Sequence, residues 1–370
     1  MNDWLELAVL IITIAGSAYA VWRHGFSQGK KIGVARLAEQ RAEIEQIKAQ
    51  LDAAQEDRKA QDKQLIASFS SRERLWTRFA PIKPPGFDAA IARSKTKVVT
   101  IGNLKGGVAK TTLSINLAAY FAAPPRSKRV LIIDLDYQGS ATNTLRQYVK
   151  SPRRESSVNV VFEKDCTTAQ FKAACEALPE LPRVTLLGAA QDLDDVESKA
   201  MIDWFADQGT FDVRYDLARF LCDPAIRNEF DLILIDTPPR LTTGMINALC
   251  ASTHLLIPTK LDVTSAEAVG PFWSKVDSLA TELNPALRLA GVVGTLTRID
   301  GLEEPEEDAV GVLRSQVPRD GPDDPLIARI LPYKKAIASE AGSGIAYVAD
   351  SNSRKIFAAI GDELAKRIEI

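Results

Sequence analysis

A strand–loop–helix pattern in residues 97–120 constrains the fold more than any other stretch of the chain. The β-branched run 97–101 predicts a buried strand, a loop with two adjacent glycines follows, and residues 113–120 predict a helix. In such a loop, consecutive backbone N–H groups and the positive end of the helix dipole face the same point, which favours an anion. Glycine lets the backbone approach a phosphate where a Cβ would intrude. The pattern therefore predicts a phosphate-binding loop within an α/β sheet.

The loop departs from the strict phosphate-loop pattern G-x-x-x-x-G-K-[ST] at two places, because Leu104 and Ala109 occupy the glycine positions. Its other residues suit a nucleotide. Lys110 can reach the β- and γ-phosphates, and the Thr111 hydroxyl can ligate Mg²⁺. A glycine turn with incidental lysines is the alternative. We predict a nucleotide-binding loop made of Lys105, Gly106, Gly107, Val108, Ala109, Lys110, Thr111 and Thr112.

An additional lysine, Lys105, directly precedes the glycine pair. With this lysine, residues 105–112 closely resemble the deviant Walker A motif of the ParA/MinD family of ATPases. The resemblance implies ATP and Mg²⁺ as ligands. It also implies a homodimer that sandwiches the nucleotide, in which Lys105 reaches the partner's ATP, so that both Lys105 and Lys110 have catalytic roles.

A second motif follows the predicted buried strand 129–134. Residues 134–142 resemble the D-x-D-P-Q-G motif of the same family, with Tyr137 in place of the proline. The resemblance implies that Asp136 positions the lytic water and that Asp134 supports the Mg²⁺ shell. Carboxylates at the C-terminal end of a strand, beside a phosphate loop, suit the orientation of an attacking water. A plain acidic strand end is the alternative.

A third motif is the run of four aliphatic residues that ends in Asp236, typical of a Walker B strand. Asp236 would hold Mg²⁺ through water, so the predicted metal-binding residues are Thr111, Asp134 and Asp236. The following Thr-Pro-Pro resembles the family's switch segment, and its prolines stiffen a loop that must sense the γ-phosphate. Arg240 is either an arginine finger or a solvated loop residue.

Further segments complete an alternating pattern of strands and helices. Strands are predicted at residues 183–188, 254–259, 289–296 and 326–331, an amphipathic helix at 204–221, and an acidic surface loop at 300–324. The alternation predicts an α/β fold with a doubly wound, mostly parallel sheet over residues 94–370. The resemblance to the ParA/MinD family covers nearly all of this P-loop NTPase domain.

Residues 4–22 are almost wholly apolar, with Glu6 as an early interruption. At ~1.5 Å per residue they give a helix of roughly 28 Å, close to the thickness of the hydrocarbon core. Basic residues follow this run, whereas only Asp3 is charged before it. The positive-inside rule then predicts a single-pass anchor in residues 1–27, in the bacterial inner (cell) membrane, with the N-terminus outside and the ATPase domain cytoplasmic. A signal peptide and a buried core helix are the alternatives.

Residues 28–80 contain no proline and are rich in Ala, Gln, Glu, Lys and Arg, which predicts a long helical stalk. Several apolar residues fall on heptad positions a and d, but polar residues occupy others. A weak coiled coil and a solvated single helix therefore both remain open. Three prolines then end the stalk and begin a predicted linker over residues 81–93.

Charge and cysteine content restrict the function further. The net charge is −2, but residues 1–97 hold 16 Lys/Arg against 11 Asp/Glu, whereas residues 98–370 hold 30 against 37. The acidic balance of the second part argues against a broad DNA-binding surface, although the basic final helix leaves nonspecific DNA open as a partner. Four cysteines without a C-x-x-C pair and two histidines argue against structural zinc, and suit a reducing compartment.

These observations lead to one main hypothesis and two alternatives. The main hypothesis is a membrane-anchored ParA-like ATPase, Mg²⁺-dependent, slow and stimulated by a protein partner, that acts as a dimerisation switch in the partitioning or positioning of DNA or a protein assembly. A bacterial tyrosine kinase is the first alternative, but its tyrosine-rich tail is missing, since the last tyrosine is Tyr347. The second is a nucleotide-binding scaffold without significant turnover.

Overall fold

The computed structural model describes residues 45–46, 48, 75–92, 94–149, 157–207, 210–297, 302–317, 324–327, 331–332 and 344–370. The chain divides into two compact units, residues 1–69 and 70–370, and nearly all described residues belong to the second. The predicted anchor at 4–22 and most of the predicted stalk lie outside the described residues. Within the described residues, no helix has the length and apolar character needed to cross a membrane.

The second unit is built on an eight-stranded sheet with the order β3-β4-β2-β5-β1-β6-β7-β8. Every pairing is parallel except that between β3 and β4. The mostly parallel sheet predicted from the sequence is therefore confirmed. The strands are β1 (Lys97–Ile101), β2 (Val130–Asp134), β3 (Glu176–Ala177), β4 (Val184–Leu187), β5 (Leu232–Asp236), β6 (His254–Lys260), β7 (Arg288–Thr297) and β8 (Leu331–Pro332).

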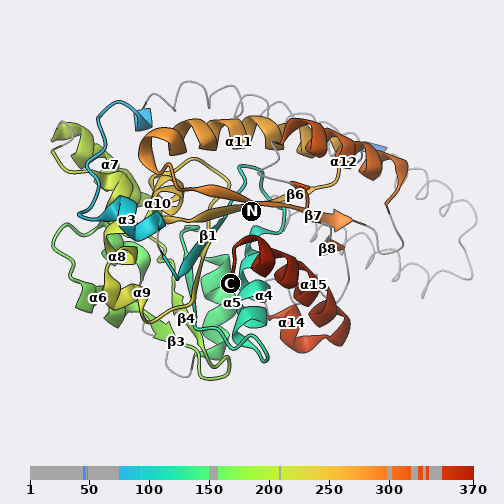
Figure 1. Cartoon of the computed structure of the whole chain (residues 1–370), viewed down its shortest axis with the longest axis horizontal. Helices are drawn as coiled ribbons and strands as arrows, with labels where there is room; N and C mark the ends of the chain where they lie inside the picture. The colour runs from blue at the N-terminus through green and yellow to red at the C-terminus, as the bar shows by residue number, and fades with distance from the viewer. Residues whose placement is uncertain are drawn as a thin grey trace, which may run out of the picture. The chain divides into compact units, whose positions relative to one another are not determined.

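Helices cover both faces of the sheet. In Figure 1, α11 and α12 lie over one face, and α4, α14 and α15 pack together on the other. The helices are α3 (Phe87–Ala92), α4 (Lys110–Ala122), α5 (Ser140–Leu145), α6 (Thr168–Ala174), α7 (Leu193–Ala206), α8 (Asp216–Leu221), α9 (Pro224–Arg227), α10 (Thr243–Ala251), α11 (Val263–Leu283), α12 (Glu304–Gln316), α14 (Ala346–Ala349) and α15 (Ser351–Arg367). Three 3₁₀ helices accompany them: η1 (Arg146–Tyr148), η2 (Val158–Phe162) and η3 (Val213–Tyr215).

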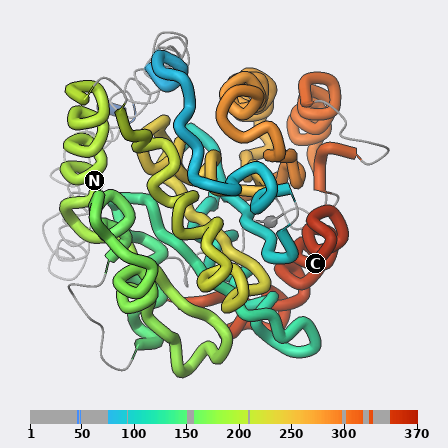
Figure 2. Tube along the Cα trace, turned by 60° about the vertical axis from the view of Figure 1, so that its left-hand side comes forward, coloured from blue at the N-terminus to red at the C-terminus, as the bar shows by residue number. Residues whose placement is uncertain are grey.

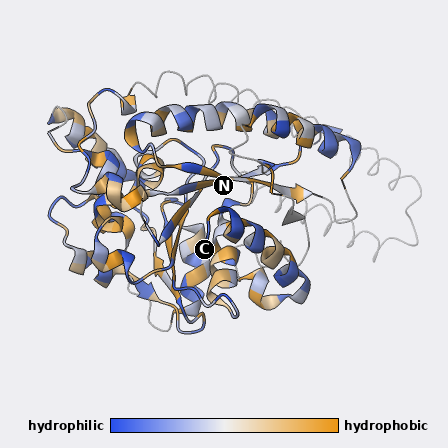
Figure 3. Cartoon of the chain, viewed as in Figure 1, coloured by the Kyte–Doolittle hydropathy of each residue, from blue (hydrophilic) through white to orange (hydrophobic). Residues whose placement is uncertain are grey.

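The strands β2 and β5 are apolar up to their terminal aspartates because both faces of a parallel sheet are covered. All five residues of β2 and all five of β5 are buried. In Figure 3, α11 and α12 are mostly blue to white, whereas orange residues are frequent in the strands of the sheet. The register pairs Asp236 of β5 with Asp134 of β2 and with Ile101 of β1. The acidic strand ends and the start of the phosphate loop therefore meet at one edge of the sheet.

Two predicted elements are wrong. In both, side chains that cap backbone N–H groups decide where a helix begins, and the residue pattern alone did not show this. The predicted helix 204–221 is interrupted: α7 ends at Ala206, and the Asp212 carboxylate accepts the Arg214 N–H to begin η3. The predicted acidic loop 300–324 contains α12, where the Glu306 carboxylate accepts the Glu303 N–H at 3.0 Å. Acidic residues at a helix N-terminus stabilise it.

Other predicted elements differ in extent. Of the predicted strand 326–331, the described residues form an isolated bridge between Leu326 and Val292 and the beginning of β8 at Leu331. The second unit starts at Ser70, which is N-terminal to the predicted domain boundary at residue 94. Figure 2 shows residues 75–92 in blue, packed along this unit, and Phe87 and Ile91 of α3 are buried in it.

Candidate phosphate-binding site

The loop between β1 and α4 surrounds open space. Gly107 and Ala109 have φ angles of 68° and 63°, so the loop uses the left-handed region twice within three residues. A Cβ added to Gly106 or Gly107 would meet nothing within 4 Å. No side chain caps the N-terminus of α4, and its first N–H groups are therefore available to a ligand. A cavity of about 440 Å³ lies against these residues.

The two lysines of the loop point to different places. Lys110 is buried beside the cavity, and its Nζ donates to the backbone oxygen of Lys105 at 3.1 Å. Burial lowers the pKa of Lys110, while Asp236 and Asp136 act in the opposite direction. The Lys105 Nζ instead donates to Ser265 Oγ, 2.8 Å away near the start of α11. Lys105 therefore lies outside the set of residues that line its own cavity.

Thr111 and Asp236 come together as the predicted Mg²⁺ site requires. The Thr111 hydroxyl donates to Asp236 Oδ2 at 2.7 Å, and Ser114 donates to Oδ1 at 3.0 Å. Burial, with the nearby Asp134 charge as a second cause, raises the pKa of Asp236 to about 7. A cation at this point would favour the ionised form of the carboxylate. The sequence reasoning missed Ser114, whose spacing of one helical turn from Lys110 is a usable signal.

Asp134, predicted to support the Mg²⁺ shell, accepts hydrogen bonds from residues of the second motif. Its Oδ2 accepts the Thr142 N–H and hydroxyl at 2.8 and 2.7 Å, and its Oδ1 accepts the Asp136 N–H at 3.1 Å. Burial raises the pKa of Asp134 to about 6, and the hydrogen bonds from Thr142 oppose that rise. Since both oxygens are engaged, Asp134 positions the loop that contains Asp136.

Asp136 lines the same cavity as the phosphate loop. Its Oδ1 accepts the Gln138 N–H at 3.0 Å, which leaves Oδ2 free of any hydrogen bond among the described residues. Burial raises the pKa of Asp136, whereas the charges of Lys110 and Arg240 lower it. The Arg240 guanidinium lies 4.8 Å from the ring centroid of Tyr137, the residue that replaces the motif proline. Arg240 thus joins the Asp136 loop to the switch segment.

The far side of the cavity is formed by residues that the sequence analysis did not select. They come from α4, α5 and the C-terminal part of the chain: Asn116, Ser140, Thr144, Gly344 and Ala346. Asn116 joins two of these parts, because its Nδ2 donates to the Thr112 oxygen at 2.7 Å and its Oδ1 accepts the Tyr347 N–H at 2.7 Å. Only the folded chain brings residue 347 to the middle of α4.

The arrangement suits a nucleoside triphosphate with Mg²⁺. The uncapped helix N-terminus and Lys110 provide donors for phosphate oxygens, and Thr111 with Asp236 provides oxygen ligands for the metal. In the part of the chain that the structure describes, no group of three or more His, Cys, Asp or Glu side chains could hold a metal alone. Mg²⁺ would therefore complete its coordination with phosphate oxygens and water.

Comparison with known proteins places this site in a family. The family model described as the AAA domain matches residues 96–289. The chromosome-partitioning ATPase Soj of Thermus thermophilus is 31% identical over 206 residues, which cover 55% of this chain and 71% of Soj. The sporulation initiation inhibitor protein Soj of Bacillus subtilis is 33% identical over 203 residues, or 54% and 72% of the two chains. The chain belongs to the ParA/Soj family of P-loop ATPases.

Solved structures agree with the family in fold. Apo McdA from a cyanobacterium of the genus Cyanothece superposes with a TM-score of 0.59 and 20% identity, covering 73% of this chain and 99% of McdA. Cobyrinic acid a,c-diamide synthase from Mycobacterium smegmatis, with a bound ATP analogue and magnesium, has a TM-score of 0.53 and 28% identity, covering 70% and 95%. Residues 1–95 of this chain lie outside the region that the family model matches.

Proposed function

We propose that this chain is a membrane-anchored, ATP-dependent dimerisation switch that partitions or positions DNA or a protein assembly. The contact between Thr111 and Asp236 beside the buried Lys110 is the observation on which the nucleotide part depends. Lys110 and Thr111 bring a phosphate-binding cation and a metal-binding hydroxyl to one open cavity, and the buried Asp236 carboxylate accepts a hydrogen bond from that hydroxyl. The proposal extends the family's ATPase activity to a cycle of dimer formation and release.

Each site residue has a role in this proposal. Lys110 and the N–H groups at the start of α4 bind the phosphates, and Mg²⁺ held near Thr111 and Asp236 neutralises the charge that develops on them. Asp136, which lines the same cavity, orients the attacking water, with Asp134 as its positioning residue. Hydrolysis depends on this positioning and on charge stabilisation, as in other phosphoryl-transfer sites.

Lys105 supplies the argument for a dimer. Its ammonium group donates to Ser265, and Lys105 is not among the residues that line its own cavity, which supports a role toward a second copy of the chain. Ser265 also donates to Asp262 Oδ2 at 2.6 Å, and both residues belong to the beginning of α11. We propose that ATP draws Lys105 from this resting contact to the partner's phosphates.

The anchor and partner complete the proposal. The apolar run 4–22, followed by basic residues, would fix the switch to the inner membrane with the ATPase domain in the cytoplasm. A tethered domain cannot diffuse over DNA as a free one does. An assembly or protein partner at the membrane is therefore the favoured target, with nonspecific DNA as the other candidate.

The test measures ATP turnover and oligomeric mass of the full chain in detergent, with and without nonspecific duplex DNA. We expect ATP with Mg²⁺ to double the protein mass by light scattering, and the Asp136→Ala variant to remain dimeric while losing turnover. Stimulation by DNA would assign DNA as the partner, whereas its absence directs the search to membrane proteins. Normal turnover by Asp136→Ala would contradict the catalytic assignment. A protein that binds ATP without changing mass would contradict the switch.

A further inference from the structure

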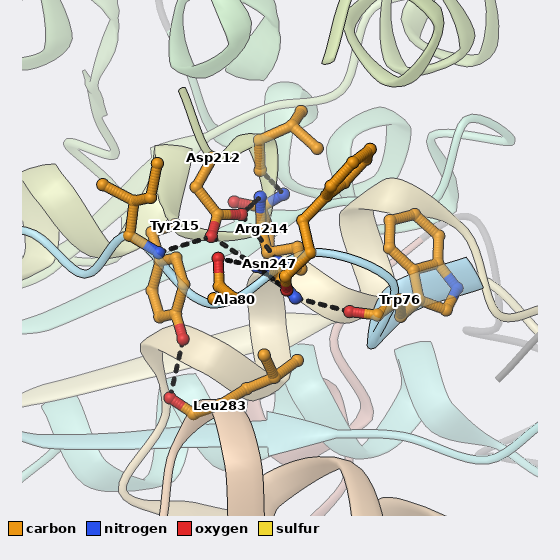
Figure 4. A network of polar contacts seen from close by, with 10 residues as sticks. Trp76, Ala80, Asp212, Arg214, Tyr215, Asn247 and Leu283 are labelled. Atoms are coloured by element: carbon orange, nitrogen blue, oxygen red, sulfur yellow. Dashed lines mark hydrogen bonds and ion pairs between the residues drawn. The ribbon is translucent and has the colours of Figure 1, made fainter. Parts of the chain in front are cut away.

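The segment 76–82, just before α3, is held by a buried ion pair that we call the Asp212–Arg214 clamp (Figure 4). The Arg214 side chain donates to the backbone oxygens of Trp76, Phe79 and Ala80. It also donates to both oxygens of the Asp212 carboxylate, at 2.7 and 2.6 Å. One guanidinium thereby donates hydrogen bonds to three carbonyl groups of a single segment of chain.

The carboxylate of the clamp holds the same segment from its other end. Asp212 Oδ2 accepts the Ile82 N–H at 2.9 Å. Ring packing adds to these bonds, since Trp76 stacks on Trp204 of α7 at 6.2 Å and the Arg214 guanidinium lies 4.9 Å from the Trp204 ring centroid. The Arg214 side chain is 0% exposed and the Asp212 side chain 2%. The clamp is thus part of the domain core, although the segment it holds comes from outside the family-matched region.

The clamp also bonds to α10 through one side chain. Asn247 Nδ2 donates to the oxygen of Val213, the residue between the two clamp residues, at 2.7 Å. Its Oδ1 accepts the Leu217 N–H at 2.9 Å, at the beginning of α8. Asn247 is fully buried, so α10 cannot shift without moving or breaking these two bonds.

The helix α10 is in turn continuous with the site. It begins at Thr243, after the switch segment that follows Asp236. Asp236 accepts the Thr111 hydroxyl, and the Thr237 hydroxyl donates to the Ile101 oxygen at 2.9 Å, next to the phosphate loop. An unbroken path of bonded groups therefore connects the phosphate loop, the switch segment, α10, Asn247 and the clamp.

We propose that the clamp couples the nucleotide state of the phosphate loop to the docking of segment 76–82, which spans the end of the predicted stalk and the start of the predicted linker. A ligand that moves the switch segment would shift α10 and loosen the clamp, because Arg214 already makes five hydrogen bonds that displacement can only weaken. Coupling of this kind is reciprocal, so undocking of the segment would change nucleotide affinity by the same factor. The inference rests on the proposed function, since it requires nucleotide binding at the loop.

The test follows the Ile82 amide, because its hydrogen bond to Asp212 reports clamp closure directly. Hydrogen exchange is measured by mass spectrometry on the full chain with ADP and Mg²⁺, and with a non-hydrolysable ATP analogue and Mg²⁺. A fluorescent nucleotide measures binding independently. We expect the exchange rate of the peptide that contains Ile82 to differ at least threefold between the two nucleotides.

Two variants, with one control, test whether the coupling passes through Asn247 and the clamp. Asn247→Ala removes both bonds from α10, and we expect it to abolish the difference between the nucleotides at Ile82. Tyr215→Phe is the matched control, since Tyr215 is equally buried next to the clamp but its hydroxyl donates to Leu283 instead, at 2.8 Å. We expect this control to keep the full difference. Asp212→Asn, an isosteric change, should accelerate Ile82 exchange with either nucleotide and alter the ratio of the two nucleotide affinities at least twofold.

The outcomes separate the coupling from the proposed function. Nucleotide binding with identical Ile82 exchange in both states would overturn the coupling and leave the ATPase switch intact. Persistence of the full difference in Asn247→Ala would also overturn it. Absence of nucleotide binding in the unaltered chain would overturn the proposed function and the coupling together. If Asn247→Ala fails to fold in a thermal melt, the affinity ratio of Asp212→Asn decides, and an unchanged ratio overturns the coupling.

Discussion

The phosphate loop and the Asp212–Arg214 clamp each contain a buried cation, but the two cations differ in how many hydrogen bonds the rest of the chain gives them. The Lys110 ammonium group makes a single hydrogen bond among the described residues, to a neutral carbonyl, and lies beside a cavity. The Arg214 guanidinium makes five, two of them to a carboxylate. A buried cation that the chain fully satisfies holds structure, whereas one left with a single neutral acceptor beside open space is available to a ligand.

The electrostatics of the loop agree with this distinction. Burial lowers the pKa of Lys110, and the carboxylates of Asp236 and Asp136 only partly compensate. A bound phosphate would add negative charge and favour the protonated amine. Substitutions in the clamp should therefore lower the free energy of unfolding most, and substitutions in the phosphate loop should lower the affinity for nucleotide most.

The largest expected effect on stability comes from Arg214→Ala. Removing one partner leaves Asp212 buried without its cation, which costs about 3–5 kcal/mol in the free energy of unfolding. Denaturant unfolding of the full chain measures the change. Arg314→Ala is the matched control, since Arg314 pairs with Asp324 at 2.7 Å but is 51% exposed, and it should cost below about 1 kcal/mol. Equal losses of stability for the two arginine substitutions would contradict the view that the buried clamp holds the structure together.

Lys110→Ala should have the opposite profile. We expect the affinity for ATP to fall at least about 100-fold, equivalent to ~2.7 kcal/mol, because the principal phosphate-binding cation is lost. Titration of the full chain with a fluorescent ATP analogue measures it. The control Lys95→Ala removes an exposed lysine two residues before β1 and should leave affinity unchanged. An Arg214→Ala protein that remains folded yet loses as much affinity would show that the two sites are not separable.

The two sites also differ in how far the sequence could predict them. The phosphate loop, Asp136 and Asp236 follow strands, so local apolar runs with their terminal residues were enough to locate them. The clamp residues gave no such signal, because Arg214 contacts carbonyl groups more than 130 residues earlier in the chain. The cavity wall contributed by Asn116 and Ala346 was missed for the same reason. Interactions distant in sequence require the fold.

Errors in the sequence prediction arose where side chains compete with the apolar pattern. The hydrophobic residues between 204 and 221 favour one helix, but Asp212 caps a new element and joins Arg214 within the core. Conversely, acidic residues near 303 predicted a loop although they stabilise the N-terminus of α12. Capping depends on which backbone N–H groups are free, and composition does not report this.

A pH-dependent effect of intermediate size is expected at Glu197, which contacts the start of α10. This carboxyl accepts the Gly244 N–H at the start of α10, and burial raises its pKa to about 7. Between about pH 5 and pH 7 the unfolded chain has released this proton while the folded chain retains it, so stability falls as pH rises through this range and levels off above the folded-state pKa. Glu197→Gln removes the titration and should gain about 2 kcal/mol relative to the unaltered chain over that range.

Urea unfolding at several pH values measures this difference. Glu267→Gln, an exposed residue on α11, is the control and should give a difference independent of pH. If Glu197→Gln gives a constant difference as well, then the carboxyl is not held as a neutral group at the start of α10. Nucleotide-dependent movement of α10 would in that case have no pH-sensitive component from this residue.

The smallest expected effect concerns the strain within the phosphate loop. Ala109 has a φ of 63°, in the region where an L-residue costs about 1 kcal/mol and glycine costs little. Ala109→Gly should therefore stabilise the domain by about 0.5 kcal/mol, after allowance for the greater freedom of glycine in the unfolded chain. Ala358→Gly, in the middle of α15, should instead destabilise by about 1 kcal/mol. If the two Ala→Gly substitutions change the free energy of unfolding in opposite directions, the backbone strain lies at the ligand-binding loop. If both destabilise the protein equally, Ala109 adopts its positive φ without a measurable cost.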